Sequence, residues 1–546
     1  MRNTIWRRPT TYSLCAGLLG VAACSMSEDS SDDSYGPDTG TGLTGSDTST
    51  TGPGDGDDQN EEELEASFRA PVVSGPYLWT ANPQSDRVAR IHATSLTVEL
   101  FESGHGPTFL SALPEGATPG GALILNELSR DASIFLMDEA GAVQPVNRIK
   151  VQHGASAWAV GQSGTYAIAW SKFGDSSLPG IDGHQDLTLF DFSSEKIETK
   201  TLAVGYRPSE VFINQDETFA YVVCDPGISV ISLRDRAIVR EIFLPEGNLV
   251  GSRDIEFSPD GSLAISRTQG SADALLIDTE DAEIKILTLP GVITDIDMSE
   301  DGSLAIAVVR GEQGSEDGAG GAGGVGGASS DEGESQPSIV ALLNPETVFD
   351  SPKFERVETD EIVGSVVISA DASQAILYTN ASDNTRLTLL NPKTKALRVV
   401  DVKAPARAAF LAEDGSFAVA LMSPPSGSNK SGAFALIPVA KNLPPRIEGT
   451  NNQPEYVSLS GELQRALITT TNSATSQADI FFAQFPGLLV DRIRLSSRPL
   501  ATGLVPGAEQ GFVAQEHPEG RVTFINLTNG QEKTVTGFEL AAKVVD

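Results

Sequence analysis

Five histidines are the side chains of this sequence best suited to metal binding or proton transfer near neutral pH. They are scattered along the chain, at His92, His105, His153, His184 and His517. No two of them have a metal-ligand spacing such as His-x-x-x-His, which would place both rings on one face of a helix. We therefore expect surface or loop histidines and no histidine-based metal site.

Nucleophilic groups are also sparse. The chain has three cysteines and no Gly-x-Ser-x-Gly elbow that would expose a catalytic serine. Cys224 ends the strand-like run 220–224, so we expect its thiol to be buried and inert. Aspartates and glutamates are too numerous for one catalytic pair to stand out. The sequence thus predicts no catalytic residue, no bound metal and no cofactor.

The first 23 residues have the three parts of an export signal. Arg2, Arg7 and Arg8 precede an uncharged apolar stretch at 13–23. This stretch is shorter than the ~20 apolar residues that a membrane-spanning helix needs, and it has the length of a signal-peptide core. We therefore expect residues 1–23 to be a signal peptide.

The signal ends in Val21-Ala22-Ala23-Cys24, which resembles the lipobox of bacterial lipoproteins. The resemblance implies cleavage before Cys24, with Val21, Ala22 and Ala23 as the lipobox and Cys24 as the lipid attachment site. Because Ser25 follows the cysteine, it also implies an outer-membrane lipoprotein of the bacterial cell envelope, periplasmic or surface-exposed. The alternative is an ordinary signal peptide with a cysteine at the cleavage point.

Acidic residues dominate the rest of the chain. Between positions 24 and 65 there are 13 acidic residues and no lysine or arginine, so we expect residues 24–66 to form a disordered acidic tether. The whole chain has a formal charge of −36. A nucleic-acid-binding protein would carry a basic footprint instead, so we expect no nucleic-acid partner.

A repeat organises the remaining residues, 67–546. The unit is an apolar strand, a tight turn containing Asp-Gly and a second apolar strand, and its clearest copies turn at Asp260, Asp301 and Asp414. Weaker copies turn near 116–120, 164, 216, 371, 460 and 507. We expect two-residue turns in which both Asp and Gly take positive φ, so that these aspartates are turn formers rather than acids or bases.

Two further strands follow each turn unit, and the step between turns, 44 residues from 216 to 260, matches the period of roughly 40–45 of a propeller blade. The run 257–262, Phe-Ser-Pro-Asp-Gly-Ser, resembles the repeats of Tol-translocation and WD-like propellers, and 221–223 resembles the YVTN surface-layer type. The resemblance implies an all-β fold, a β-propeller of four-stranded blades with about 8–10 repeat units. These form one ring or split into two.

The two ends of the repeat region predict how the ring closes. The first unit begins at Tyr77 with its second strand, and residues 539–546 read as a first strand without its turn. We expect the C-terminal strand to close the propeller by completing the first blade. The Gly-rich segment 311–337 is expected to be a disordered insertion between two strands of one blade.

Propeller scaffolds host both enzymes and pure binding proteins, so the fold alone does not give function. With no catalytic set in the sequence, we expect a membrane-anchored, extracytoplasmic, non-catalytic scaffold. Its partner is expected to be a protein or glycan bound at the propeller mouth. The alternative is a metal-dependent hydrolase resembling the seven-bladed lactonase family, with a metal held by carboxylates of the central channel.

Overall fold

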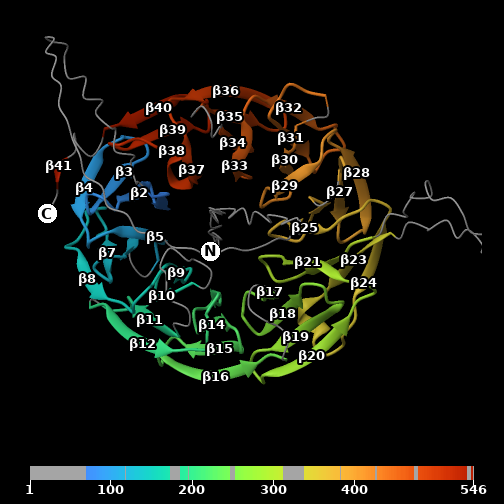
Figure 1. Cartoon of the computed structure of the whole chain (residues 1–546), viewed down its shortest axis with the longest axis horizontal. Coiled ribbons are helices and arrows are strands. Elements are labelled where there is room, and N and C mark those ends of the chain that lie inside the picture. Colours follow the sequence, from blue (N-terminus) through green and yellow to red (C-terminus); the bar gives the residue numbers. More distant parts are fainter. Residues whose placement is uncertain are drawn as a thin grey trace, which may run out of the picture. The chain divides into compact units, whose positions relative to one another are not determined.

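The computed structural model describes residues 69–116, 119–172, 185–194, 196–245, 253–311, 337–380, 383–424, 427–471, 477–537 and 543–544. These residues form ten sheets, arranged as the blades of one ring (Figure 1). Each blade has four antiparallel strands, and a fifth strand is added to the sheet of blade 1. The predicted all-β propeller is confirmed, with ten repeat units in a single ring. The lipobox, Cys24, the tether, His184 and residues 312–336 of the Gly-rich insertion lie outside the described residues.

Each blade runs along the chain from its innermost strand, beside the central channel, to its outermost strand on the rim (Figure 1). Blade 1 contains β1 (Val72–Ser74), β2 (Tyr77–Asn82), β3 (Arg87–His92) and β4 (Val98–Glu102). Blade 2 contains β5 (Pro107–Leu113), β6 (Gly121–Asn126), β7 (Asp131–Leu136) and β8 (Asn147–Lys150). Blade 3 contains β9 (Ala157–Val160), β10 (Tyr166–Trp170), β11 (Asp186–Asp191) and β12 (Glu198–Ala203). Blade 4 contains β13 (Glu210–Ile213), β14 (Phe219–Cys224), β15 (Gly227–Ser232) and β16 (Ala237–Phe243). Blade 5 contains β17 (Arg253–Phe257), β18 (Leu263–Thr268), β19 (Asp273–Asp278) and β20 (Glu283–Thr288).

The second half of the ring repeats this order. Blade 6 contains β21 (Ile293–Met298), β22 (Ala305–Val309), β23 (Ser338–Leu343) and β24 (Glu355–Thr359), with the short helix α1 (Pro345–Val348) before its last strand. Blade 7 contains β25 (Ser365–Ile368), β26 (Ala375–Tyr378), β27 (Arg386–Asn391) and β28 (Ala396–Asp401). Blade 8 contains β29 (Ala406–Leu411), β30 (Phe417–Met422), β31 (Gly432–Pro438) and β32 (Arg446–Thr450). Blade 9 contains β33 (Gln453–Ser460), β34 (Arg465–Thr471), β35 (Ala478–Gln484) and β36 (Leu489–Leu495). Blade 10 contains β37 (Pro499–Val505), the 3₁₀ turn η1 (Pro506–Ala508), β38 (Gln510–Gln515), β39 (Arg521–Asn526) and β40 (Glu532–Thr536).

The Asp-Gly turns join the first and second strands of a blade, and we call them the 1–2 turns. In blade 5 the amide of Gly261 donates to the carbonyl of Ser258 at 2.7 Å, and Gly261 has a φ of +77°. Asp260 does not take positive φ; its carboxylate accepts hydrogen bonds from the Ser258 hydroxyl at 2.6 Å and the Ser262 amide at 3.1 Å. The aspartate therefore shapes the turn through its side chain, and the expected two-residue turn is instead a four-residue loop, 259–262.

Blade 1 differs from the prediction in its innermost strand. Val72–Ser74 pair with β2, so this blade has a first strand of its own, too short for its alternation to be recognised in the sequence. The C-terminal strand β41 (Lys543–Val544) does join blade 1, but it runs parallel to β4 at the opposite, outer edge. It therefore extends the first blade and does not replace its innermost strand.

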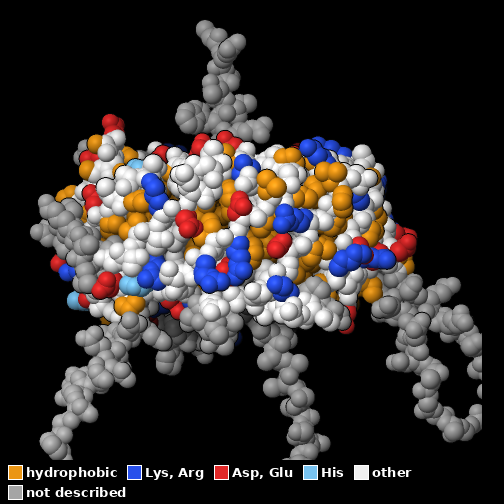
Figure 2. Space-filling view, turned by 90° about the horizontal axis from the view of Figure 1, so that it is seen from above, with side chains coloured by type: hydrophobic (Ala, Val, Ile, Leu, Met, Phe, Trp, Pro, Cys, Tyr) orange, Lys and Arg blue, Asp and Glu red, His pale blue; other side chains and the backbone are white. Residues whose placement is uncertain are grey.

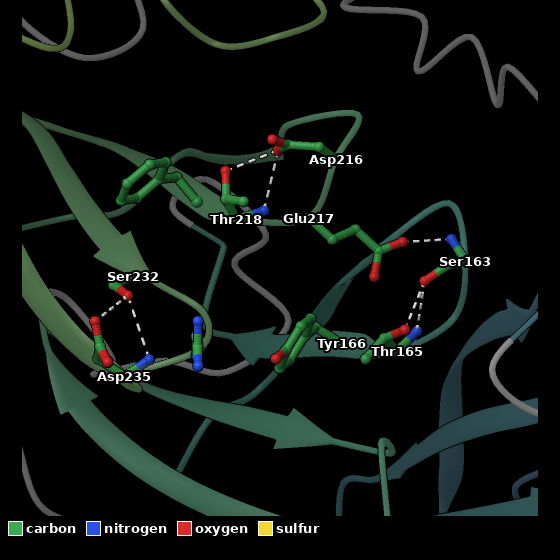
Figure 3. Close-up of a pocket in the computed structure, with 10 residues that line it drawn as sticks. Ser163, Thr165, Tyr166, Asp216, Glu217, Thr218, Ser232 and Asp235 are labelled. Carbon is green, nitrogen blue, oxygen red and sulfur yellow. Dashed lines mark hydrogen bonds between the residues drawn. The ribbon is translucent and has the colours of Figure 1, made fainter.

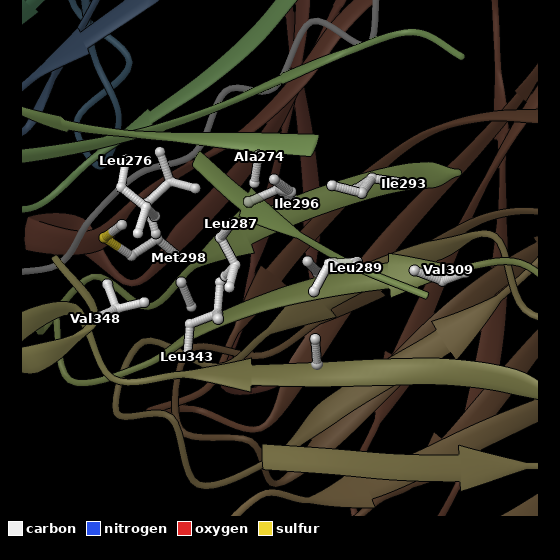
Figure 4. Close-up of a cluster of buried hydrophobic side chains, with 14 of the residues drawn as sticks. Ala274, Leu276, Leu287, Leu289, Ile293, Ile296, Met298, Val309, Leu343 and Val348 are labelled. Atoms are coloured by element: carbon white, nitrogen blue, oxygen red, sulfur yellow. The ribbon is translucent and has the colours of Figure 1, made fainter. Parts of the chain in front are cut away.

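Apolar side chains between neighbouring blades hold the ring together. Figure 4 shows the cluster between blades 5 and 6, in which Leu276 and Leu287 meet Ile296 and Met298. Blade 10 packs on blade 1 in the same way, with Phe512 and other buried residues against the first blade. The ring thus closes through the side-chain packing that also joins the other blades.

The rim of the ring carries apolar and basic side chains as well as the acidic ones that the net charge suggests. The edge of the ring drawn in Figure 2 carries apolar side chains among Lys, Arg, Asp and Glu. Outermost strands such as β16 and β36 combine buried or partly buried side chains with exposed ones. Phe243 and Leu489 are among the exposed apolar residues. No helix within the described ranges is long and apolar enough to cross a membrane.

Candidate functional site

Acidic side chains gather on the innermost strands of blades 4, 5 and 6, beside the channel. They are Glu210 on β13, Asp254 and Glu256 on β17, and Asp295 and Asp297 on β21. Strand alternation explains their placement, because Ile255 and Phe257 pack against blade 4 and leave the acidic residues of β17 on the opposite face. These are the channel carboxylates that the hydrolase alternative would need.

Two of these carboxylates bind the next blade. Asp295 accepts a hydrogen bond from the amide of Val366 at 2.8 Å, and Asp297 accepts one from the amide of Ile368 at 2.9 Å. The two-residue spacing of the aspartates matches the spacing of the free amides on the edge of β25, so they cover an exposed strand edge. Among the residues that the structure describes, no three His, Cys, Asp or Glu side chains are grouped so that they could hold a metal ion.

Burial, and to a smaller extent their proximity, changes the proton affinity of these carboxylates. Burial, followed by the charge of Asp297, raises the pKa of Glu256 to about 9. Burial also raises the pKa of Asp295 and of Asp297 to about 6, although each accepts a backbone hydrogen bond that acts in the opposite direction. This part of the channel wall therefore binds protons more readily than isolated carboxylates would.

A polar pocket of ≈ 590 Å³ opens between blades 3 and 4 (Figure 3). Its volume lies within the range of about 300–1,000 Å³ that is usual for small-molecule sites. Its walls are the 1–2 turns of both blades and the turn between the third and fourth strands of blade 4. Most of the side chains that line it carry a hydroxyl or a carboxylate.

Glu217 is the residue that joins the two blades at this pocket. It is the third residue of the four-residue 1–2 turn of blade 4, with a φ of +54°, where the clearest repeats have glycine. Its Oε1 accepts a hydrogen bond from the amide of Ser163 in blade 3. Gly161 makes room for this contact, because a Cβ at that position would lie 2.6 Å from the Glu217 carboxylate oxygens. A left-handed backbone costs an ordinary residue ~1–2 kcal/mol. At Glu217 this conformation is accompanied by a hydrogen bond between blades 3 and 4.

The other polar side chains of the pocket are held by local hydrogen bonds. Asp216 accepts from the hydroxyl of Thr218 at 2.7 Å, and Asp235 accepts from the hydroxyl of Ser232 at 2.8 Å. Figure 3 shows the pair of Asp216 and Thr218 above, the pair of Ser232 and Asp235 at the left, and Tyr166 below Glu217. Burial raises the pKa of Tyr166, so its phenol stays protonated and can donate a hydrogen bond at neutral pH.

A second contact between blades 3 and 4 holds the outer wall of this region. Arg236 follows the pocket turn of blade 4 and forms ion pairs with Glu198 and, at 3.9 Å, with Asp191 of blade 3. Together with the bond from Ser163 to Glu217, this contact fixes the two blades on either side of the pocket. The walls are therefore largely set before any ligand arrives.

The residues singled out from the sequence do not meet at this pocket. The ring of His92 packs edge-on against Tyr77, with ring centroids 5.2 Å apart. His105 pairs with Asp86 at 2.7 Å, and His517 accepts from the amide of Glu519. Cys224 is buried, as expected, and burial raises the pKa of its thiol to about 12.

The pocket was not predicted from the sequence, although the sequence contained one indication. At positions 216 and 217 the repeat reads Asp-Glu where its clearest copies read Asp-Gly. A residue other than glycine at a turn position that requires positive φ can mark a functional site. The partners of Glu217 could not be found in this way, because they depend on how blade 3 packs against blade 4.

Comparisons with known proteins give no family. No protein-family model matches the chain, and no curated protein matches it. Among solved structures, the chain is similar to a eukaryotic initiation factor, at 11% identity over 87% of this chain and 97% of that chain, with a TM-score of 0.46. It is also similar to the dihydro-heme d1 dehydrogenase NirN, at 11% identity over 69% of this chain and 73% of that one, with a TM-score of 0.39. A third similarity is to hydrazine synthase of Kuenenia stuttgartiensis, at 12% identity over 60% of this chain and 95% of that one, with a TM-score of 0.32.

Proposed function

We propose that this protein is a lipid-anchored, non-catalytic binding scaffold of the bacterial cell envelope. Cys24 carries the anchor, the acidic segment 24–66 is the tether, and the propeller presents a binding surface. The observation that carries the binding function is the polar pocket between blades 3 and 4, whose walls are fixed by bonds between the blades. A pre-formed concave site with convergent polar groups is the usual form of a ligand site.

The channel carboxylates support the non-catalytic part of the proposal. Asp295 and Asp297 have their side chains committed to the backbone of blade 7, where each accepts a hydrogen bond. A hydrolase of the lactonase type would need such carboxylates free to bind a metal and activate water.

The anchor is tested by metabolic labelling of the producing bacterium with an alkyne fatty acid, followed by separation of the membranes on a density gradient. Wild-type protein should take up the label and sediment with the outer membrane. The Cys24→Ala variant should lose the label, whereas Cys15→Ala, the matched control, should keep it. Unlabelled wild-type protein would contradict the lipid anchor.

The non-catalytic assignment has a separate test. The purified full-length protein is incubated with γ- and δ-lactones in the presence of Ca²⁺, Mn²⁺ or Zn²⁺, and ring opening is followed by pH indicator. We expect no turnover above the metal alone. Turnover that disappears with EDTA would replace the scaffold with the hydrolase.

A further inference from the structure

We propose that the pocket between blades 3 and 4 binds a polyhydroxylated ligand, that is, a glycan. This inference rests on the proposed binding function and assigns it a ligand class and a place on the ring. The central residue is Glu217, which is 8% exposed. One carboxylate oxygen binds Ser163, but the other, Oε2, is buried without a hydrogen-bond partner among the described residues.

A buried acceptor without a donor is unfavourable by ~1–3 kcal/mol, and by more when it is charged. Figure 3 shows the second oxygen of Glu217 on the side of Thr165 and Tyr166, within the space that the pocket residues enclose. Because Oε2 is buried in the ligand-free protein, a ligand hydroxyl would supply the missing donor once a small movement of the turn exposes it. The local fold therefore leaves one strong acceptor unused beside the pocket.

The 1–2 turns of neighbouring blades contact one another in different ways around the ring. At three other junctions the turns are joined directly by backbone hydrogen bonds. These are Gln215 to Pro259 at 2.8 Å, Asp301 to Ala370 at 3.2 Å, and Ala370 to Glu413 at 3.1 Å. Between blades 3 and 4 the long side chain of Glu217 makes the connection instead. The turns are held together there through a side chain, and the pocket adjoins that contact.

The arrangement of polar groups favours a ligand with several separate hydroxyls. Glu217, Asp216 and Asp235 offer carboxylate acceptors at different points of the wall, and Arg234 supplies a donor. Because no three His, Cys, Asp or Glu side chains of the described residues are grouped so that they could hold a metal ion, these acceptors suit several donors rather than one cation. Phosphate-rich ligands are disfavoured by three carboxylates facing one arginine.

Aromatic residues complete this pattern. Phe219, at 36% exposure, and Tyr166 belong to the same pocket. The electron-rich face of an aromatic ring attracts the C–H groups on one face of a sugar ring, while carboxylates accept from the hydroxyls around its edge.

The test uses the purified full-length protein in detergent. A printed array of neutral and acidic oligosaccharides identifies binders, and calorimetry then measures the affinity of the best one. Sedimentation with isolated peptidoglycan and with lipopolysaccharide distinguishes an envelope glycan from a free oligosaccharide. The decisive variant is Glu217→Gln, which keeps one carbonyl oxygen for the Ser163 amide and places an amide donor where Oε2 was. We expect at least tenfold weaker binding.

The matched control is Glu509→Gln. Glu509 lies in the 1–2 turn of blade 10, directly before β38, with a φ of +50°, and its carboxylate accepts from Thr528 at 3.1 Å. It does not line the pocket, so this variant should bind the glycan as the wild type does. Melting temperatures of both variants monitor the fold, and both should remain near that of the wild type.

Three results would overturn the glycan site. They are an array without binders, equal binding by Glu217→Gln and wild type, and equal weakening by the two variants. Binding of putrescine with the same dependence on Glu217 would assign the pocket to an ammonium ligand instead. None of these results removes the lipid anchor, because that part of the proposed function stands or falls with the labelling of Cys24.

Discussion

Gly261 occupies a place where a side chain would collide with the neighbouring blade. A Cβ there would lie 2.6 Å from the hydroxyl oxygen of Tyr221, and the backbone has a φ of +77°. Gly270 shares the left-handed conformation, with a φ of +82°, but a Cβ there would meet nothing within 4 Å. The pair separates the effect of backbone strain from that of the close contact between blades.

We expect Gly261→Ala to lower the free energy of unfolding by ~2–4 kcal/mol, because it adds both strain and overpacking. Gly270→Ala should cost only the strain, ~1 kcal/mol. Denaturant unfolding followed by tryptophan fluorescence measures both. Equal losses for the two variants would mean that the contact with Tyr221 does not matter.

Burial of Asp297 makes the stability of the ring depend on pH. Its folded-state pKa, about 6, lies above the ordinary value of 3.8 because of burial. The folded state therefore binds this proton more tightly than the unfolded state, and the carboxyl makes the ring less stable as the pH rises from about 4 to 6. Asp297→Asn removes the charge but keeps an oxygen for the Ile368 amide. We expect its melting temperature to exceed that of the wild type at pH 8 and to equal it at pH 4.

For Asp301, in the turn that follows the same strand, we expect the opposite pH dependence of stability. Burial alone would raise its pKa, but hydrogen bonds from Ser299 and Ser303 outweigh this effect and lower it. Its stabilising contribution is therefore present at neutral pH and is lost as the pH falls below the ordinary value. Asp301→Asn should lower the melting temperature more at pH 7 than at pH 3. The same pH profile for both variants would refute the assigned environments.

At the scale of the elements, the first blade shows which strand matters for closing the ring. Its inner edge is β1, its outer edge is extended by β41, and its broad face packs against blade 10. Burial of apolar surface dominates the stability of such a contact, whereas two paired residues in a parallel strand contribute little. Closure should therefore depend on the packing between blades 10 and 1 and not on the C-terminal strand.

Truncation tests this expectation. A chain lacking residues 538–546 should remain folded, with a melting temperature within a few degrees of the full chain. Phe524→Ala, in the packed contact between blades 10 and 1, should lower the free energy of unfolding by ~3–5 kcal/mol because it leaves a cavity. Calorimetry measures both, and an unfolded truncation variant would assign closure to the C-terminal strand after all.

For the whole molecule, the formal charge of −36 predicts a dependence on salt. Like charges repel one another in the compact ring, and dissolved ions screen this repulsion over a Debye length of ~10 Å at 0.1 M. We expect the melting temperature at pH 8 to rise between 10 mM and 300 mM salt, equally for NaCl and KCl. An unchanged melting temperature would show that local ion pairs, such as Arg492 with Asp479, balance the net charge.

The repeat architecture follows from local properties of the chain. Period-two alternation, turns with glycine at left-handed positions and a spacing near 43 residues are features of contiguous segments, so they determine four-stranded blades before any long-range contact is known. Asp260, Asp301 and Asp414 were recognised as turn formers for the same reason, although their role in the turn is side-chain hydrogen bonding. Counting units limits the number of blades to about 8–10, but their exact number and their closure into one ring depend on how all the blades pack together.

Tertiary structure alone determined the remaining features. The short β1 lacks a recognisable pattern and is a strand only because β2 pairs with it. The pocket depends on Glu217 reaching Ser163, 54 residues away, and the channel carboxylates depend on Asp297 meeting Ile368, 71 residues away. Such contacts arise from the angle at which one blade packs on the next. That angle is set by the volumes of many buried side chains together and is not encoded in any one segment.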